Sequence, residues 1–175
     1  MDQSGLSSDV EVDLDLDLEY DAWFARVEAT YAAVSFCCFH RLNDRDLADR
    51  VGLRVVAGLA ARPTIFRFTG LPFSGRIGAL AERWIVEARA GRLGDDGDWI
   101  SLERALRAVP KAERDILVLS CVRGEDDVAV GYRLRCNPAS VPERVASTLR
   151  FFDQLMMKLL PGERALGRII EAAQA

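Results

Sequence analysis

Apolar residues recur every three or four positions through most of this chain of 175 residues, which is the spacing of one face of an α-helix. The first stripe begins after Tyr20, the second follows Asn43, and the third runs from about residue 74 to residue 90. They consist of Trp23, Val27, Tyr31, Val34 and Cys38, then Leu47, Val51, Val55 and Leu59, then Ile77, Leu80, Ala81, Trp84, Ile85 and Ala88. Asn43 occupies a helix-capping position. The pattern predicts an all-α fold.

The stretch GRLGDDGDW, which begins at residue 91, interrupts the helical pattern with three glycines and three aspartates. This composition is typical of a linker. We therefore expect one helical domain over residues 20–90, a linker over 91–100 and a second helical domain over 101–175. In the second domain, Ser101 is expected to cap a helix, and Pro110 is expected to open another helix that Gly124 ends in a left-handed cap.

The segment GYRLRCNPASVPERV, residues 131–145, predicts a turn between two helices. Asp126 or Asp127 can cap a short helix before it, in which Gly131 is expected to let a crossing helix approach closely. Pro138 disfavours a helical conformation in the residue before it. Ser140 and Glu143 have the spacing of a capping box, so a second, longer helix is expected to start there and to end at Pro161.

A short helix, a tight turn and a longer helix with a basic start form the plan of a helix-turn-helix, whose second helix enters the major groove of DNA by its N-terminal residues. A helical hairpin that only packs into a core has the same pattern. Both interpretations remain open from the residues alone.

Charge is distributed unevenly along the chain. The first 21 residues hold eight acidic residues and no Lys or Arg, and the rest holds 23 basic against 19 acidic residues. The body therefore carries a net charge of +4, although that of the whole chain is −4. Residues 1–19 are expected to form a disordered acidic arm, which can fold on a basic surface of a partner or of the chain itself.

Several classes of function find no support in the residues. There is no apolar run long enough for a membrane span and no secretory signal, so a cytoplasmic protein with free thiols is expected. Cys37, Cys38 and His40 lack a second ligand pair at zinc-binding spacing, and Cys121 and Cys136 are expected in the core and in a turn. No catalytic constellation is present, and we expect no enzyme, no metal and no cofactor.

The chain resembles the extracytoplasmic-function group of bacterial sigma factors over about residues 20–160. ALRAVPKAERDILVLSCVRGEDD, continued through VAVGYRLRCNPASVPERV, is similar to their C-terminal domain, sigma domain 4. NDRDLADRVGLRVV and FSGRIGALAERWIVEAR are similar to two helices of sigma domain 2. The positions of the C-terminal domain that fit the family pattern are Leu106, Pro110, Arg114, Leu117, Leu119, Gly124, Val130, Leu134, Ser140, Val141 and Arg144.

The resemblance implies two sigma-like domains and two kinds of binding residue. The first domain-2 helix docks on the clamp helices of RNA polymerase in the family, which implies a polymerase-binding role for Asp46, Asp49 and Arg54. These residues are expected on the solvent side of the apolar stripe. The second such helix and the helix-turn-helix contact promoter DNA in the family. The implied DNA-binding residues are Arg76, Arg83, Arg133, Arg135, Ser140, Arg144 and Arg150.

The sequence departs from the family pattern at the positions that contact DNA. Arg76 stands at a tryptophan position, and Glu82 with Arg83 replaces an Arg-Asn pair. In the helix-turn-helix, Arg135 replaces the glycine of the turn, and Pro142 and Glu143 replace polar or basic residues. A carboxylate that faces DNA is repelled by phosphate, so these departures oppose promoter melting and promoter reading.

These observations predict a sigma-factor-like transcription protein that binds the RNA polymerase core. Within that class, both a working sigma factor and a degenerate regulator that reads no promoter are open. The alternative is a mimic that binds an anti-sigma factor or another protein partner and does not touch DNA. The acidic arm suits either hypothesis, as a nucleic-acid mimic or as a shield over the chain's own arginines.

Overall fold

The computed structural model describes residues 5–63, 75–94 and 97–160, without the side chains of residues 5–14 and of Arg76. Over these residues the chain forms helices and turns and no strand, so the predicted all-α fold is confirmed. The elements are α1 (Gly5–Leu42), α2 (Arg45–Ala60), α3 (Gly75–Arg89), α4 (Trp99–Arg107), α5 (Lys111–Ile116), the π-helical segment η2 (Leu117–Arg123), α6 (Asp127–Arg133), the 3-10 turn η3 (Pro138–Ser140) and α7 (Val141–Leu159).

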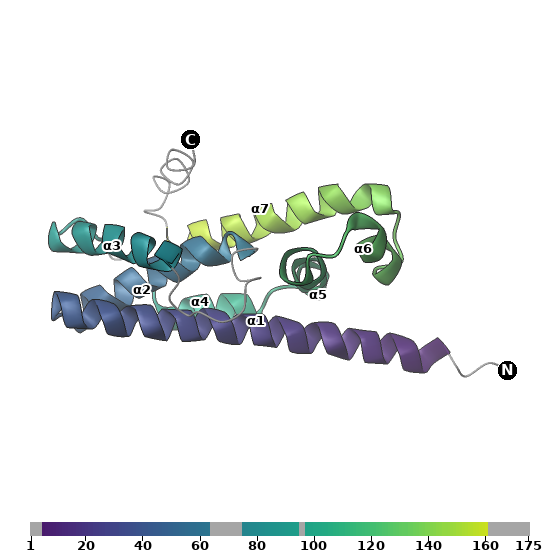
Figure 1. Cartoon of the computed structure of the whole chain (residues 1–175), viewed down its shortest axis with the longest axis horizontal. Coiled ribbons are helices and arrows are strands. Elements are labelled where there is room, and N and C mark those ends of the chain that lie inside the picture. Colours follow the sequence, from purple (N-terminus) through teal and green to yellow (C-terminus); the bar gives the residue numbers. More distant parts are fainter. Residues whose placement is uncertain (1–4, 64–74, 95–96, 161–175) are drawn as a thin grey trace.

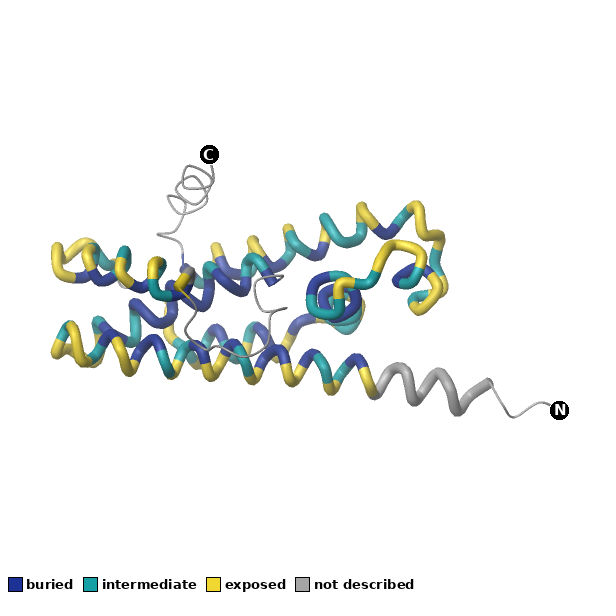
Figure 2. Tube along the Cα trace, viewed as in Figure 1, coloured by how far each residue is buried: buried dark blue, intermediate teal, exposed yellow. Residues whose placement is uncertain are grey.

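Helix α1 runs along the length of the body and organises the other helices (Figure 1). Helices α2 and α3 pack against its C-terminal half, and α5 and η2 pack against its N-terminal half. Helix α7 lies opposite α1 and contacts α2, α4, α5 and α6. The buried residues line the inner sides of these helices, while the outer sides are exposed (Figure 2). The molecule is therefore elongated, with α3 and α6 near opposite ends.

The N-terminal part of α1 differs from the disordered arm that the sequence predicts for residues 1–19. Residues 5–19 continue the helix, whereas residues 1–4 lie outside the described part of the chain. A helix places Leu16 and Tyr20 on one face, where both are buried, and leaves Leu18 62% exposed. The alternation of acidic and apolar residues thus serves helical packing, because only some of its leucines need to face the core.

The helix starts differ from the expected caps by a few residues. Asp44, and not Asn43, caps α2: its carboxylate accepts a hydrogen bond from the backbone N–H of Leu47 at 3.0 Å. Asn43 instead ends α1 in a left-handed conformation, with φ 51°. Similarly, Asp98 caps α4 by accepting from the N–H of Ser101 at 2.7 Å, so Ser101 lies inside the helix that it was expected to cap.

Other predicted boundaries in the second half are confirmed. Pro110 precedes α5, and Gly124 ends the continuous helix of α5 and η2 in a left-handed cap with φ 72° and ψ 35°. Asp126 caps α6 through the N–H of Ala129 at 2.8 Å. The long helix α7 ends at Leu159, close to the expected stop at Pro161, which lies outside the described residues.

Buried side chains from both sides of the expected linker form one cluster. The Trp23 ring of α1 meets the Phe152 ring of α7 edge-on, with centroids 5.9 Å apart. Trp99 of α4 stacks on Tyr31 of α1 at 4.4 Å, and the Gly97 N–H donates to the Leu159 carbonyl at 3.2 Å. The structure therefore does not confirm two separate domains joined at residues 91–100.

A membrane-spanning helix is not found in the part of the chain that the structure describes, because none of its helices combines the length and the apolar character that a bilayer core requires. Helix α1 shows the reason. It is long enough, with 38 residues, but charged residues recur along it.

Candidate functional site

The short helix, turn and longer helix expected around residues 127–159 are present as α6, the turn that contains η3, and α7. The turn folds back onto α6, where the Cys136 N–H donates to the Gly131 carbonyl at 2.9 Å. A Cβ at Gly131 would lie 3.0 Å from Pro138 Cγ and 3.1 Å from the Cys136 carbonyl oxygen. Glycine is therefore needed here because the turn, and not a crossing helix, lies against α6.

The predicted capping box at the start of α7 is wrong. Ser140 already has helical dihedral angles, and its hydroxyl donates to the Asn137 carbonyl at 2.7 Å instead of capping α7. The Asn137 side chain accepts from the Ala139 N–H at 3.0 Å. Because η3 leads directly into α7, the helical turn starts before Ser140, and the Asn137 side chain caps it at the Ala139 N–H. Glu143 is exposed.

Arg135 occupies a backbone conformation that favours glycine. Its φ is 50°, which for a residue with a Cβ costs about 1 to 2 kcal/mol. The left-handed conformation at this position is the one that glycine adopts most readily.

The residues expected to contact DNA fall into two groups. The first group lies on α6, the turn and α7, where Arg133, Arg135 and Arg150 are exposed and Ser140 and Arg144 are half-buried. Arg83 is half-buried on α3, and the Arg76 side chain lies outside the described residues. The structure does not bring the two groups together, since α3 and α6 lie near opposite ends of the molecule (Figure 1).

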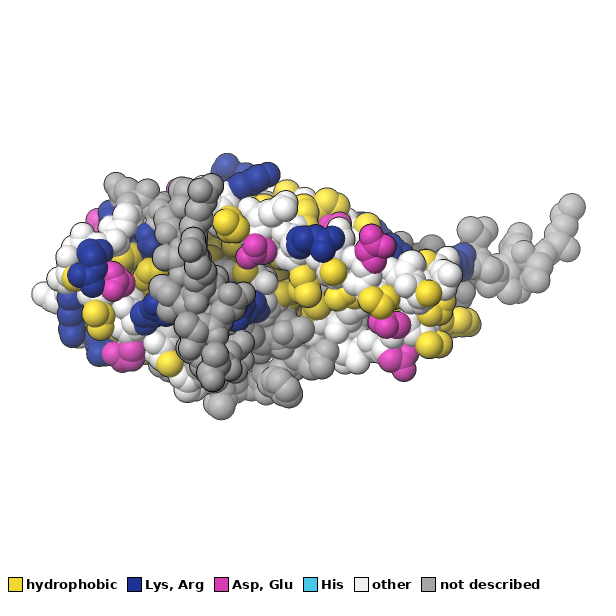
Figure 3. Space-filling view, turned by 90° about the horizontal axis from the view of Figure 1, so that it is seen from above, with side chains coloured by type: hydrophobic (Ala, Val, Ile, Leu, Met, Phe, Trp, Pro, Cys, Tyr) yellow, Lys and Arg dark blue, Asp and Glu magenta, His cyan; other side chains and the backbone are white. Residues whose placement is uncertain are grey.

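The face that α7 presents is mixed in charge. Lys and Arg side chains stand apart on it, between carboxylates and apolar side chains, and do not form a continuous basic stripe (Figure 3). Arg150 and Lys158 are exposed on α7, and so are Glu143 and Asp153. A continuous phosphate-binding track is thus not visible on this face.

The carboxylate expected to repel DNA from α3 has a protein partner. Glu82 pairs with Arg41 of α1, with Arg41 Nη2 donating to Glu82 Oε2 at 2.9 Å. Arg89 of α3 donates to the Arg41 carbonyl at 3.1 Å. Glu82 therefore connects α3 to α1, and its charge is partly neutralised by this pair.

The expectation that Arg54 faces a partner is wrong. Arg54 is 5% exposed, with its guanidinium 5.0 Å from the centre of the Trp84 ring and Nη2 donating to the Gly94 carbonyl at 3.4 Å. Helix α3 and the following segment cover this side of α2, so Arg54 lies in the interior. Asp46 is exposed and Asp49 half-buried, with Asp49 Oδ2 3.5 Å from Arg45 Nε. These two residues remain accessible.

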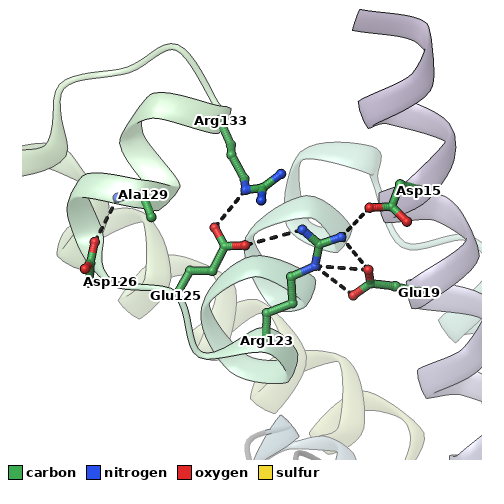
Figure 4. Close-up of polar contacts among 7 residues, drawn as sticks. All are labelled: Asp15, Glu19, Arg123, Glu125, Asp126, Ala129 and Arg133. Atoms are coloured by element: carbon green, nitrogen blue, oxygen red, sulfur yellow. Dashed lines mark hydrogen bonds and ion pairs between the residues drawn. The ribbon is translucent and has the colours of Figure 1, made fainter. Parts of the chain in front are cut away.

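A cluster of charged residues joins α1, η2 and α6, and we call it the Arg123 cluster (Figure 4). Arg123 Nε donates to the Glu19 carboxylate at 2.9 Å, and Nη2 donates to Asp15 at 2.5 Å. Glu125 lies on the other side, 3.3 Å from Arg123 Nη1, and accepts from Arg133 Nε at 3.0 Å. The cluster thus connects the acidic part of α1 to a predicted DNA-binding arginine.

Two more cations of α5 face the acidic part of α1. Asp17 Oδ1 lies 3.3 Å from Arg114 Nη1 and 4.0 Å from Lys111 Nζ. From the sequence, a shield over the chain's own arginines is one of two open roles of the arm, and the individual ion pairs are not predicted. The spacing of Asp15 and Glu19 indicates such pairing only if the arm is helical, because the two residues then share one face of the helix.

The electrostatic environment of Arg123 favours its charge. The hydrogen bonds that Arg123 donates to Glu19 raise the pKa of the guanidinium above its ordinary value; desolvation opposes this effect, and the bonds to Asp15 and Glu125 add to it. Arg123 is therefore cationic at every pH at which the protein is folded. Only a competing anion or high salt can replace its carboxylate partners.

The cysteines do not form a metal centre in the described part of the chain, where no group of three His, Cys, Asp or Glu residues has suitable geometry. Burial raises the pKa of the Cys38 thiol to about 11. The thiol is thus protonated at neutral pH, whereas a zinc ligand is a thiolate. Cys121 is buried in the core and Cys136 lies in the turn, as predicted.

Comparison with known proteins does not assign this site: no protein-family model, no curated protein and no solved structure matches the chain significantly.

Proposed function

We propose that this chain is a sigma-factor-like transcription protein that binds the RNA polymerase core and promoter DNA. The observation that supports the proposal most directly is the turn between α6 and α7. Arg135 adopts the left-handed conformation at the position where the family pattern has glycine, and Gly131 packs against the turn. Arg133, Arg135 and Arg150 are exposed around it. A pull-down on core polymerase, followed by run-off transcription, tests the two halves of the proposal.

Binding to the polymerase core is expected to depend on the accessible acids of α2. Asp46→Lys combined with Asp49→Lys should weaken core binding at least about tenfold, or about 1.4 kcal/mol, because like charges across an interface are repulsive. The measurement is titration of labelled core polymerase with each variant. Asp21→Lys combined with Glu28→Lys is the matched control, since both residues are exposed on α1. Equal affinity of the two variants for core polymerase would show that α2 is not the docking element.

Contact with promoter DNA is expected to involve Arg144, which lies in the first turn of α7. Arg144→Ala should weaken DNA binding by roughly 1 to 3 kcal/mol if the side chain reads a base. Pro142→Lys with Glu143→Ser should strengthen binding, because it adds a cation and removes a carboxylate. The measurement is binding of promoter fragments by the chain within its polymerase complex. Identical affinities for all three proteins would show that α7 does not read DNA.

The second candidate function, a sigma mimic that binds an anti-sigma factor or another protein, is favoured by the surface of α6. Tyr132 is 85% and Val128 67% exposed, and the two residues lie one helical turn apart. Exposed aromatic and apolar residues are frequent at protein interfaces. The mixed charge on the α7 face also suits a protein partner better than a phosphate backbone (Figure 3). Polymerase binding without any DNA binding would favour this function.

A further inference from the structure

The end of α1 before Tyr20 contacts α5 and η2 through ion pairs on either side of the buried Leu16. Three cations, Lys111, Arg114 and Arg123, face α1 from α5 and η2, and we call them the covered cations. The α1 carboxylates that face them are Asp15, Asp17 and Glu19, which follow one another at every second position of the helix. Lys111 also pairs with Asp115, and Arg123 with Glu125. The ion-pair distances include 3.3 Å from Arg114 to Asp17 and 2.5 Å from Arg123 to Asp15. The carboxylates thus occupy the positions at which other anions would bind.

The carboxylates cover the cations but are themselves open to water. The side chains of Arg123, Arg114 and Lys111 are 19%, 25% and 38% exposed, whereas Asp15 is 59%, Asp17 42% and Glu19 33% exposed. Ion pairs with a solvated partner contribute little free energy and weaken with salt. These contacts are therefore weak enough for a polyanion to displace them.

Tyr20 marks the point up to which α1 is firmly held. Its side chain is 2% exposed, and its hydroxyl donates to the Leu106 carbonyl at 2.7 Å. Trp23, the next buried residue along this face, packs against Phe152. On the N-terminal side of Tyr20, Leu16 is buried and the three acids form the ion pairs described above. Displacement of this end of α1 would therefore expose Leu16 but leave the anchors at Tyr20 and Trp23 in place.

The covered cations adjoin the helix-turn-helix. Arg123 and Arg133 share the carboxylate of Glu125, so the cations on η2 and those of α6 lie on neighbouring elements (Figure 4). Guanidinium groups bind phosphate oxygens with two parallel hydrogen bonds just as they bind carboxylates, so phosphates can take the place of the α1 carboxylates. A phosphate backbone that contacts α6 can therefore extend onto η2 and α5.

We propose that Lys111, Arg114 and Arg123 form a second phosphate-binding surface, and that the end of α1 up to Glu19 is a built-in cover that duplex DNA displaces. The inference rests on the DNA-binding part of the proposed function and is independent of polymerase binding. The cover keeps the cations neutralised when no DNA is present. Binding then exchanges carboxylates for phosphates, so the protein responds to polyanions at high local density and not to isolated anions.

The first experiment removes the charge of the cover without removing residues. Asp15→Asn with Glu19→Gln deprives Arg123 of both α1 partners, and Asp21→Asn with Glu28→Gln removes the same charge from exposed positions that pair with no described residue. Binding of a labelled duplex of mixed sequence is measured over a range of salt concentrations. The cover variant should bind about tenfold more tightly than the control at low salt, with a steeper salt dependence.

The second experiment removes the cover and asks which cations the DNA uses. A chain that starts at Tyr20 lacks seven acids and should bind the duplex more tightly still. Adding Arg114→Gln and Arg123→Gln should abolish this gain and reduce the salt slope by about two. Arg45→Gln with Arg104→Gln, two exposed arginines outside the site, should leave most of the gain. Circular dichroism checks that each variant is folded. If the shortened chain does not fold, the test is made by adding Arg114→Gln and Arg123→Gln to the full-length cover variant instead.

Three results would overturn the inference. The first is equal DNA binding by the cover variant and its control, and the second is a gain that persists without Arg114 and Arg123. The third is a gain in binding of polyglutamate without a gain for DNA, which would assign the surface to an acidic protein partner. Core polymerase binding by the same proteins is a separate readout. Absence of core polymerase binding would reject the polymerase part of the proposed function. Tighter DNA binding by the cover variant would still support the cover in that case.

Discussion

Replacing Trp23 with alanine is expected to lower the free energy of unfolding by about 3 to 5 kcal/mol, a large share of the stability of a typical domain. Trp23 is fully buried and lies between Tyr20 and the Phe152 ring of α7, with ring centroids 5.4 and 5.9 Å away. Removal of the indole leaves a cavity where α1 meets α7. Urea unfolding followed by circular dichroism measures the loss.

Leu18→Ala provides the control for this prediction, because Leu18 lies on the same helix but is 62% exposed. Its effect should stay within about 0.5 kcal/mol. The same titration tests the domain organisation. We expect a single transition, since Trp23 and Phe152 come from opposite sides of the expected linker and belong to one buried cluster. Two separate transitions, with Trp23→Ala moving only one of them, would support independent domains instead.

Replacing Arg54 with glutamate is expected to destabilise the fold by about 3 to 5 kcal/mol. The new carboxylate would be buried against the face of the Trp84 ring and the Gly94 carbonyl oxygen, two electron-rich groups that now attract the guanidinium. Thermal and urea unfolding measure the loss. Any defect of Arg54→Glu in polymerase binding would thus report on folding and not on the interface.

Arg45→Glu is the matched control on the same helix. The Arg45 side chain is 76% exposed and pairs with Asp49, so its reversal should cost no more than about 1 kcal/mol. Equal stability of the two variants would contradict the buried position of Arg54. Arg54→Met separates charge from packing, because it keeps an apolar stem beside Trp84; it should lose less stability than Arg54→Glu.

The helical segments themselves follow from local pattern. Apolar residues at steps of three and four predicted α2, α3 and α7, and Gly124 was assigned correctly as a left-handed end of a helix. These features depend on neighbours within about one turn, so the chain carries the information locally. The caps were less well predicted. Asp44 caps one residue after the expected Asn43, and Asp98 and Asn137 cap three residues before the expected Ser101 and Ser140, because more than one polar residue near a helix start can accept from a free amide.

The burial of Arg54 and the partners of the α1 carboxylates depend on residues far away in the chain. The charge of Arg54 predicts a solvent-exposed face of α2, yet α3 and Gly94 cover this side chain. Likewise, Asp15 and Glu19 are helical residues whose charge is balanced by Arg123, more than 100 positions later. Periodicity states which residues share a helix face, but it contains no information on which element packs against that face. The all-α fold is therefore local in origin, whereas the single core and the covered cations arise only when α1 meets α5, η2 and α7.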